Sequence, residues 1–201
     1  MSKTFLHIGC GNARKNSTTP AFGGTGWEEL RLDIDPNVQP DVVGTMTDMA
    51  MVESQSVDAV YSAHNIEHLY PHEVPLALRE FCRVLKPGGF AIVTCPDLQS
   101  VAALIAADKL TDTAYLSPAG PITPLDILYG YRPSLAEGNL FMAHHCGFTK
   151  KSLSSALLQC GFRHAATAQR SAPPFDLWAV ATKDSAEEST LRELAREHFP
   201  A

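Results

Sequence analysis

Residues 6–11 read LHIGCG, an apolar run that leads directly into a Gly-x-Gly turn. Gly9 and Gly11 carry no Cβ, so the backbone can turn sharply there and a ligand can lie against it. A β-strand that ends in such a turn is the usual opening of a nucleotide pocket. Glycines at strand ends also serve a turn alone, so the segment predicts a cofactor site only if the residues downstream agree.

Short apolar runs alternate with helical or loop patterns along the first half of the chain. They are Thr4–Ile8, Leu30–Ile34, Val57–Ser62 and Phe90–Cys95. This alternation is typical of β-α-β units in a parallel sheet.

The clearest helix is expected between the third and fourth runs, with Pro75 in its first turn. Its apolar residues recur at helical spacing: Val74, Leu78, Phe81, Cys82 and Leu85. The following Lys86-Pro87-Gly88-Gly89 is expected to end the helix and to feed the next strand through a Pro-Gly turn.

An irregular segment follows a predicted helix over Leu98–Ala107. Residues 111–148 are interrupted by prolines and glycines throughout. An insertion of this kind in an α/β domain is commonly a lid or a wall of the binding site.

The last part of the chain returns to regular structure with a helix over Lys150–Gln159 and two strands, Phe162–Arg170 and Leu177–Thr182. The connection Ser171-Ala172-Pro173-Pro174 is too short for a crossover helix, so the two strands should be antiparallel. The charged tail, residues 185–201, is expected to form a surface helix over Ala186–His198. We expect one domain over residues 1–201.

Composition narrows the class of protein. The chain has 201 residues with a hydrophobic fraction of 45%, which is ordinary for a globular domain with a core. Its 16 Lys and Arg face 22 Asp and Glu, a net charge of −6, and this disfavours nucleic-acid binding. The five cysteines form no C-x-x-C pair, which favours a reducing compartment and disfavours a zinc site. No apolar run approaches the ~18 residues of a membrane span, and the core pattern that starts at Phe5 leaves no room for a signal peptide. We therefore expect a cytoplasmic protein without a membrane segment.

A carboxylate follows the second apolar run at the interval that a ribose site needs. Asp33 lies 24 positions beyond Gly9, near the usual interval of ~20 residues, and can accept hydrogen bonds from both ribose hydroxyls. The alternative, an Asp that caps the following turn, fits Asp35 before Pro36 better.

The segment after the glycine turn lacks the helix that faces a pyrophosphate in dinucleotide sites. Residues 12–26 (NARKNSTTPAFGGTG) show no apolar periodicity and are rich in Gly, Thr and Pro. A ligand with a pyrophosphate would lose its main anchor here.

Most of the chain resembles the class I S-adenosylmethionine-dependent methyltransferases, especially small bacterial members of the methyltransferase-11 type. LHIGCG resembles the first motif, GWEELRLDIDP (26–36) the ribose-binding second strand, and PDVVGTM (40–46) the adenine-side third segment. SVDAVYSAHNIEHL (56–69) and REFCRVLKPGGFAIVTCPDL (79–98) resemble the fourth and fifth segments. GFTKKSLSSALLQCGF (147–162) and DLWAVATK (176–183) resemble the closing helix and the final antiparallel strand.

This resemblance implies an α/β, Rossmann-like fold. Its sheet would be seven-stranded and mostly parallel, with an antiparallel last strand, helices on both faces and a lid insertion after the fifth strand. It implies S-adenosylmethionine as the cofactor, which agrees with the missing helix because this cofactor has no phosphate.

The resemblance also implies which residues contact the cofactor. Gly9, Cys10 and Gly11 would line the methionine and ribose, and Asp33 would hold the ribose hydroxyls. Ile34, Thr45 and Met46 would lie on the adenine side. Ser62 to His64, at the end of the fourth strand, would lie beside the transferred methyl group.

Two positions depart from the family pattern. His7 stands where the family often has an acid that helps hold the cofactor's amino group. A neutral His7 can accept one hydrogen bond there, or its ring can point into the sheet as packing. Thr45 stands where an Asp often accepts from the adenine amino group; Thr45 accepts more weakly, and Asp48 is an alternative acceptor.

Methyl transfer from a sulfonium is an in-line displacement with a neutral leaving group. Positioning and desolvation of the acceptor therefore matter most, and a base is needed only if the nucleophile must lose a proton. Candidate bases are His64, directly after the fourth strand, and His144 and His145 at the end of the insertion.

Other polar residues have further interpretations. Asp97 and His68 are additional candidate bases, although Glu67 and His68 belong to a stretch that the family shares across many substrates and are interpreted as structural. His144 and His145 are alternatively loop or capping residues. They lack further ligands in the sequence around them, so no metal is expected.

The insertion carries side chains that suit an organic acceptor: Tyr115, Tyr129, Tyr131, Arg132, Phe141 and Met142. Some of them are expected to pack the insertion onto the sheet instead. Ser62-Ala63-His64-Asn65 resembles neither the Asn/Asp/Ser-Pro-Pro-aromatic segment of nucleic-acid amino-methyltransferases nor the Pro-Cys of the cytosine enzymes. A small-molecule acceptor and no nucleic-acid partner are expected.

Three functions follow from these features. The first is S-adenosylmethionine-dependent methyl transfer to a small molecule. The second is a methyltransferase-like protein that binds the cofactor without catalysis, for which the departures at His7 and Thr45 argue. The third is an NAD-dependent oxidoreductase, which Gly-x-Gly and Asp33 favour and the missing helix and antiparallel last strand disfavour.

Overall fold

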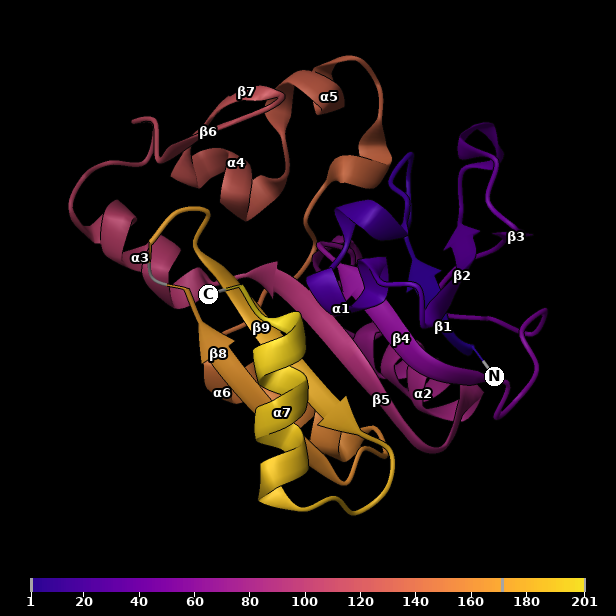
Figure 1. Cartoon of the computed structure of the whole chain (residues 1–201). Helices are drawn as coiled ribbons and strands as arrows, with labels where there is room; N and C mark the ends of the chain where they lie inside the picture. The colour runs from indigo at the N-terminus through magenta and orange to yellow at the C-terminus, as the bar shows by residue number, and fades with distance from the viewer. Residues whose placement is uncertain (1, 171, 201) are drawn as a thin grey trace.

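A seven-stranded sheet forms the centre of the computed structural model, which describes residues 2–170 and 172–200 (Figure 1). Met1, Ala201 and Ser171, the first residue of the predicted tight connection, lie outside the described residues. The strand order is β3-β2-β1-β4-β5-β9-β8, and β9 alone runs antiparallel to its neighbours in this sheet of the described chain. The strands are β1 (Lys3–Ile8), β2 (Trp27–Asp33), β3 (Val42–Val43), β4 (Val57–Ala63), β5 (Leu85–Pro96), β8 (His164–Gln169) and β9 (Asp176–Thr182). The predicted sheet is confirmed.

Helices cover both faces of this sheet, as predicted. Alternate side chains of a strand point to opposite faces, so Leu6 and Ile8 of β1 join the core under α2 (Val74–Val84) and α6 (Lys150–Gln159). Phe5 packs on the other face with Phe22 of α1 (Pro20–Gly23) and with α7 (Glu188–His198). Figure 1 shows α1 and α7 in front of the sheet and α2 and α6 behind it.

The tail helix α7 completes this second face. Its Leu191 and His198 are buried, and the His198 ring lies 4.3 Å from the Phe22 ring. Phe22 belongs to residues 12–26, which show no helical periodicity. That segment holds two short elements, the 3-10 turn Lys15–Ser17 and the single turn α1, which Thr19 caps. No helix begins at Gly11 in the described structure.

The Lys86-Pro87-Gly88-Gly89 segment differs from its prediction as a turn. α2 ends at Val84, and Leu85 already pairs with Val57 as the first residue of β5. The register then shifts between Val57 and Ala59, and Gly88 has a φ of 76°. The Pro-Gly stretch is therefore an irregularity inside a long strand, which a helical spacing pattern cannot distinguish from a helix end.

The parallel register brings the carboxyl ends of three strands to one edge. Ile8 is level with Leu32 of β2 and with Ser62 of β4. The chain order reverses between β1 and β4, so this edge is the topological switch point at which α/β sheets bind ligands. Gly9, Asp33 and Ala63 therefore meet at the same place.

The insertion folds over this edge around a small core of its own, which includes Val101, Ile122 and Ile127. It follows α3 (Leu98–Ala106) and contains the hairpin of β6 (Tyr115–Ser117) and β7 (Gly120–Ile122), then α4 (Pro124–Tyr129) and α5 (Arg132–Ala136). A 3-10 turn, Leu140–Met142, leads the chain back to the sheet. None of the described helices is long and apolar enough to cross a membrane.

Candidate cofactor and acceptor site

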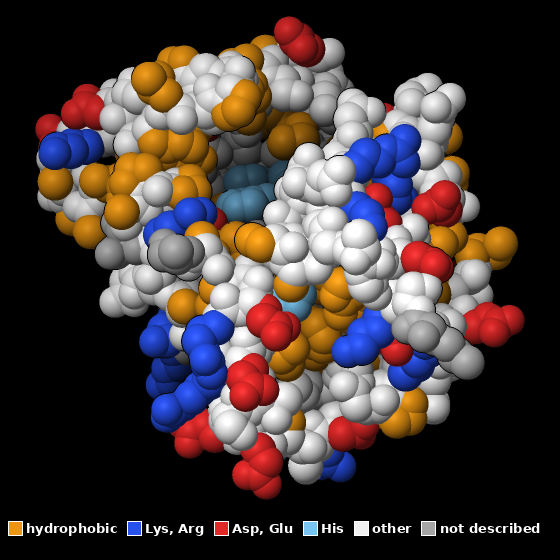
Figure 2. Space-filling view, viewed as in Figure 1, with side chains coloured by type: hydrophobic (Ala, Val, Ile, Leu, Met, Phe, Trp, Pro, Cys, Tyr) orange, Lys and Arg blue, Asp and Glu red, His pale blue; other side chains and the backbone are white. Residues whose placement is uncertain are grey.

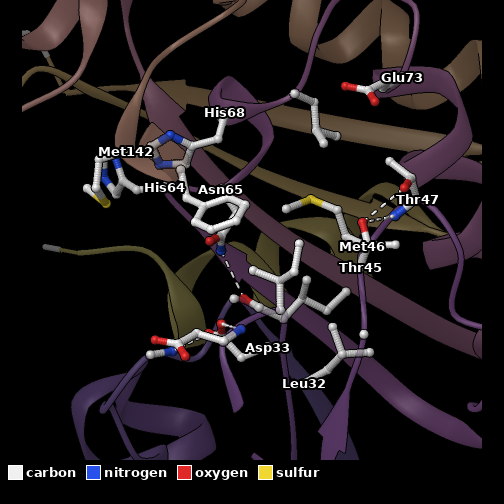
Figure 3. A pocket seen from close by; sticks show the side chains of 18 of the residues that line it. Leu32, Asp33, Thr45, Met46, Thr47, His64, Asn65, His68, Glu73 and Met142 are labelled. Carbon is white, nitrogen blue, oxygen red and sulfur yellow. Dashed lines mark hydrogen bonds between the residues drawn. The ribbon is translucent and has the colours of Figure 1, made fainter. Parts of the chain in front are cut away.

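A cavity of about 600 Å³ opens at the switch point. The ends of β1, β2 and β4 line one part of it, and residues 139–142 of the insertion line another. Figure 3 shows His64, His68 and Met142 at one end and Leu32 and Asp33 at the other. The volume is within the usual range for small-molecule sites.

Gly9 and Gly11, in the turn at the end of β1, are required for two different structural reasons. Gly9 has a φ of 59°, and a Cβ on it would lie 2.0 Å from Oδ1 of Asn65. Nδ2 of Asn65 donates to the carbonyls of Ile8 at 2.9 Å and Ala63 at 3.1 Å, so it ties β1 to β4. Gly11 has a φ of 49° and no atom within 4 Å of where its Cβ would be. Gly9 therefore makes room for Asn65, and Gly11 leaves space on the side of the cavity.

Asp33 lies in the cavity with its carboxylate already oriented. Oδ2 accepts the N–H of Gly11 at 2.7 Å and Oδ1 accepts the N–H of Asp35 at 2.9 Å. An ionised carboxylate has about four acceptor positions, so two remain for ligand hydroxyls. Asp35 caps the 3-10 turn Pro36–Val38, as predicted.

Arg31 connects the glycine turn to the loop that follows β2. Its guanidinium donates to the carbonyl of Gly11 and, at 2.7 Å, to the carbonyl of Gln39. The turn that presents Gly11 is therefore fixed by a buried cation that no sequence motif indicated.

The far side of Asp33 is apolar and partly open. Ile34 is 51% exposed and lines the cavity with Thr45 and Met46, an arrangement that suits a planar base. The Thr45 hydroxyl lies 2.9 Å from that of Thr47, which also lines the cavity. Asp48 accepts from the N–H of Ala50 and does not line the cavity.

His64 lies in the middle of the site with an unusual backbone. Its φ is 54°, a region that non-glycine residues seldom occupy and that often marks a functional position. Nδ1 lies 3.3 Å from Oε1 of Glu67, and Nε2 lies 4.0 Å from Oδ2 of Asp176. Burial acts to lower the pKa of His64, but the Glu67 carboxylate outweighs it and raises that pKa above the usual value.

Glu67 is buried beneath a group of histidines. Burial favours a raised pKa for this carboxyl group, but His64 and His68 hold the pKa below its usual value. His68 lines the cavity, and its ring lies 4.8 Å from the ring of His144. His144 does not line the cavity, and burial lowers its pKa.

Some predicted cofactor residues lie outside the cavity. Nδ1 of His7 is 2.6 Å from Oε1 of Glu29, and the ring packs 5.2 Å from that of Tyr61 on the opposite face of the sheet. Burial lowers the pKa of His7. The structure therefore agrees with the interpretation of His7 as a packing residue, and its ring does not face the cofactor cavity. Cys10 and Ser62 are also buried and do not line the cavity. The expectation that the side chains of His7, Cys10 and Ser62 contact the cofactor is therefore not met in this structure.

Other candidates divide between the cavity and the scaffold. Asp97 is fully buried and caps α3, where it accepts from Gln99 and Ser100, so it is not available as a base. His145 lines the cavity and stacks 4.1 Å from the ring of Tyr70.

The proposed aromatic wall is only partly present. Phe141 and Met142 line the cavity. Tyr115 and Tyr131 pack on the core of the insertion, and Arg132 pairs with Asp126 at 2.7 Å. Tyr129 is exposed and does not line the cavity.

Several lining residues were not predicted, namely Asn65, Leu69, Tyr70, Glu73, Asn139 and Leu140. Asn65 could have been found because it directly follows the fourth strand. The others come from turns whose path depends on tertiary packing.

Comparison with known proteins agrees with this geometry. Residues 6–93 match the family model described as a methyltransferase domain. No curated protein sequence matches the chain.

Solved structures of low sequence identity share the fold. The 1,6-didemethyltoxoflavin-N1-methyltransferase of Burkholderia thailandensis, with 1,6-didemethyltoxoflavin and S-adenosylhomocysteine bound, is 16% identical with a TM-score of 0.59 over 92% of this chain and 72% of its own. A Pyrococcus horikoshii protein is 17% identical, TM-score 0.62, over 92% and 83%. An Archaeoglobus fulgidus SAM-dependent methyltransferase is 16% identical, TM-score 0.59, over 90% and 86%.

Residues 6–93 are therefore similar to a methyltransferase domain, and the sheet has the topology of the class I, S-adenosylmethionine-dependent methyltransferase fold. This domain implies S-adenosylmethionine as its cofactor.

Proposed function

We propose that the protein transfers a methyl group from S-adenosylmethionine to a small organic acceptor bound under the insertion. The observation that carries this proposal is one continuous cavity. Its sheet side offers an open glycine turn and a carboxylate with free acceptor positions, and its other side is closed by the insertion.

The residues present fit the cofactor. Asp33 would accept from the ribose hydroxyls, Ile34 and Met46 would contact the adenine, and Gly9 and Gly11 would let the backbone approach the methionine portion. When bound, S-adenosylmethionine supplies an electrophilic methyl group. A phosphate-bearing cofactor fits less well because no helix starts at Gly11 in the described chain.

The part of the cavity beyond His64 would hold the acceptor. Phe141, Met142 and Tyr70 offer apolar contact there, so they would exclude water and hold a small organic molecule in line with the methyl group. The Burkholderia methyltransferase of similar fold has 1,6-didemethyltoxoflavin bound. That likeness of fold supports a small molecule without identifying it.

His64 is the candidate to take a proton from the acceptor. It lines the cavity at the end of β4, and its Nδ1 forms an ion pair with Glu67 at 3.3 Å. His145 also faces the cavity, where its stacking on Tyr70 favours a role in the acceptor wall. His144 lies behind the lining and is left out of the proposed proton transfer.

Thermal unfolding tests cofactor choice. S-adenosylmethionine and S-adenosylhomocysteine at 100 times their Kd should raise Tm by about 5–11 °C, because ligand binding adds about 2.7 kcal/mol to the folded state. NAD should leave Tm unchanged. No shift with either methionine derivative at millimolar concentration would overturn the proposal.

Turnover tests catalysis. Release of S-adenosylhomocysteine should depend on an added small hydroxy, amino or carbon-acid compound. For the compound that responds, His64→Asn should lower kcat by about 10²–10⁴ and change S-adenosylhomocysteine affinity little. Asn tolerates the positive φ at this position. A binding protein without activity would show the Tm shifts with no release for any compound.

A location in a reducing compartment is part of the proposal. All five cysteines are free, which is the usual state in the cytoplasm.

A further inference from the structure

A group of metal-ligand side chains lies where the end of the insertion meets the residues after β4. Glu67, His68 and His144 each offer one ligand atom, and these atoms lie within 4.8 Å of one another. Two imidazoles and one carboxylate form the protein ligands of many zinc and non-haem iron sites.

Backbone contacts fix this juxtaposition between residues far apart in sequence. The N–H groups of His145 and Cys146 donate to the Glu67 carbonyl at 2.9 and 3.2 Å. The Cys146 thiol donates to the Ile66 carbonyl at 3.2 Å. These bonds hold His144 against the 3-10 turn Ile66–His68.

Both imidazoles are oriented as metal ligands are. Nδ1 of His68 donates to the Ala143 carbonyl at 3.1 Å, and Nδ1 of His144 donates to the Ile127 carbonyl at 2.8 Å. A carbonyl oxygen only accepts, so in each neutral ring the proton is on Nδ1 and Nε2 has a free lone pair. A backbone carbonyl commonly orients metal-binding histidines in this way.

The buried carboxylate of Glu67 is a second observation that favours cation binding. The side chain is 1% exposed, and neither carboxylate oxygen has a hydrogen-bond partner among the described residues. Nδ1 of His64 forms an ion pair with Oε1 at 3.3 Å without a hydrogen bond, so both carboxylate oxygens keep acceptor positions for a cation. Buried polar groups are nearly always partnered, and a buried charge is usually paired or bound to a metal.

The group borders the cavity at His68. Figure 2 shows histidine side chains at the floor of the hollow beside the insertion.

We propose that Glu67, His68 and His144 bind one divalent transition-metal ion of the zinc type. This goes beyond the proposed function and does not depend on it, and it replaces the expectation of no metal. Zn–N and Zn–O bonds of 2.0–2.2 Å place the ligand atoms of a tetrahedral site roughly 3.4 Å apart. The side chains would therefore draw together by about an ångström on binding.

The test is metal binding by the chelator-treated full chain without S-adenosylmethionine. Calorimetry with Zn²⁺ and the visible absorption of bound Co²⁺ should both give one ion per chain with a Kd of micromolar or tighter. Glu67→Gln and His144→Ala should each weaken binding at least tenfold. The control His72→Ala removes an exposed histidine that stacks on Tyr70 and should change the Kd less than twofold.

Two results would overturn the proposal. One is no stoichiometric binding with a micromolar or tighter Kd, as expected if His64 and His68 alone balance the Glu67 charge. The other is binding that survives both substitutions or is lost equally in His72→Ala. If Glu67→Gln does not fold, the anomalous scattering of Zn²⁺ in crystals of the unchanged chain decides: a peak bonded to the three side chains supports the site, and peaks only elsewhere contradict it.

Discussion

Replacing Asp33 by Asn tests the cofactor end of the cavity. The carboxylate accepts from Gly11 and Asp35 and lines the cavity, and its remaining acceptor positions are assigned to the ribose. An Asn amide has one acceptor oxygen and one donor group. One ribose hydroxyl therefore loses its acceptor, and the other loses a charge-assisted bond. The amide NH2 group also replaces the acceptor of one backbone N–H, that of Gly11 or of Asp35.

The expected loss follows from the energies of such bonds. A hydrogen bond to a charged group contributes ~1.5–3 kcal/mol, and a neutral one about half as much. Together the changes amount to about 2–4 kcal/mol, which weakens binding by roughly 30- to 1,000-fold because 1.4 kcal/mol is a factor of ten.

The assay is isothermal titration calorimetry with S-adenosylhomocysteine at 25 °C. Asp58→Asn is the matched control, because Asp58 lies at the start of β4 and pairs with Lys86 at 2.8 Å, away from the cavity. Its affinity should stay within twofold of the unchanged chain. A loss below threefold in a folded Asp33→Asn protein would refute the assignment of Asp33 to the ribose.

Three further substitutions test the scaffold by thermal unfolding. Gly9→Ala combines positive φ with a 2.0 Å clash on Asn65 and should lower Tm by roughly 5–10 °C, or about 2–3 kcal/mol. Gly11→Ala meets no atom within 4 Å and should lower Tm by less than half as much. Equal losses in the two variants would contradict the packing argument. His7→Asp places a second carboxylate against Glu29 and should destabilise the fold by about 3 kcal/mol or more, whereas tighter S-adenosylhomocysteine binding would show that position 7 faces the cofactor. Burial lowers the pKa of His198 to about 4, whereas a His in the unfolded chain has a pKa of ~6.5. Below pH ~6.5 the unfolded chain therefore binds a proton that the folded chain does not, and the stability falls as the pH drops. From pH 7 to pH 5 this loss should be about 2 kcal/mol, or roughly 4–8 °C in Tm; His198→Phe should reduce the difference in Tm between the two pH values, and an unchanged difference would refute the assignment.

The sheet was predictable from sequence because its signals are local. Each apolar run and the Gly-x-Gly turn after β1 can be recognised within a few residues, and parallel order follows from the segments between the strands. The Pro-Gly stretch before Phe90 was predicted as a turn at the end of a helix, because proline and glycine occur both at helix ends and at irregularities within strands.

The site was predictable only where it follows strand ends. Asp33 and His64 directly end or follow strands, so their position at the sheet edge follows from the fold. The side on which His7 lies depends on strand orientation, which alternation around a single polar residue does not fix. The approach of His144 to Glu67 depends on backbone bonds from His145 and Cys146, which no sequence pattern reports.

The most direct test of the central claim is an experimental structure with S-adenosylhomocysteine bound. The proposal predicts its ribose hydroxyls on Asp33, its adenine against Ile34 and Met46, and its sulfur facing Ala63 and His64, with open space beyond it under Phe141. Binding outside this cavity, or with the sulfur directed away from His64, would contradict it.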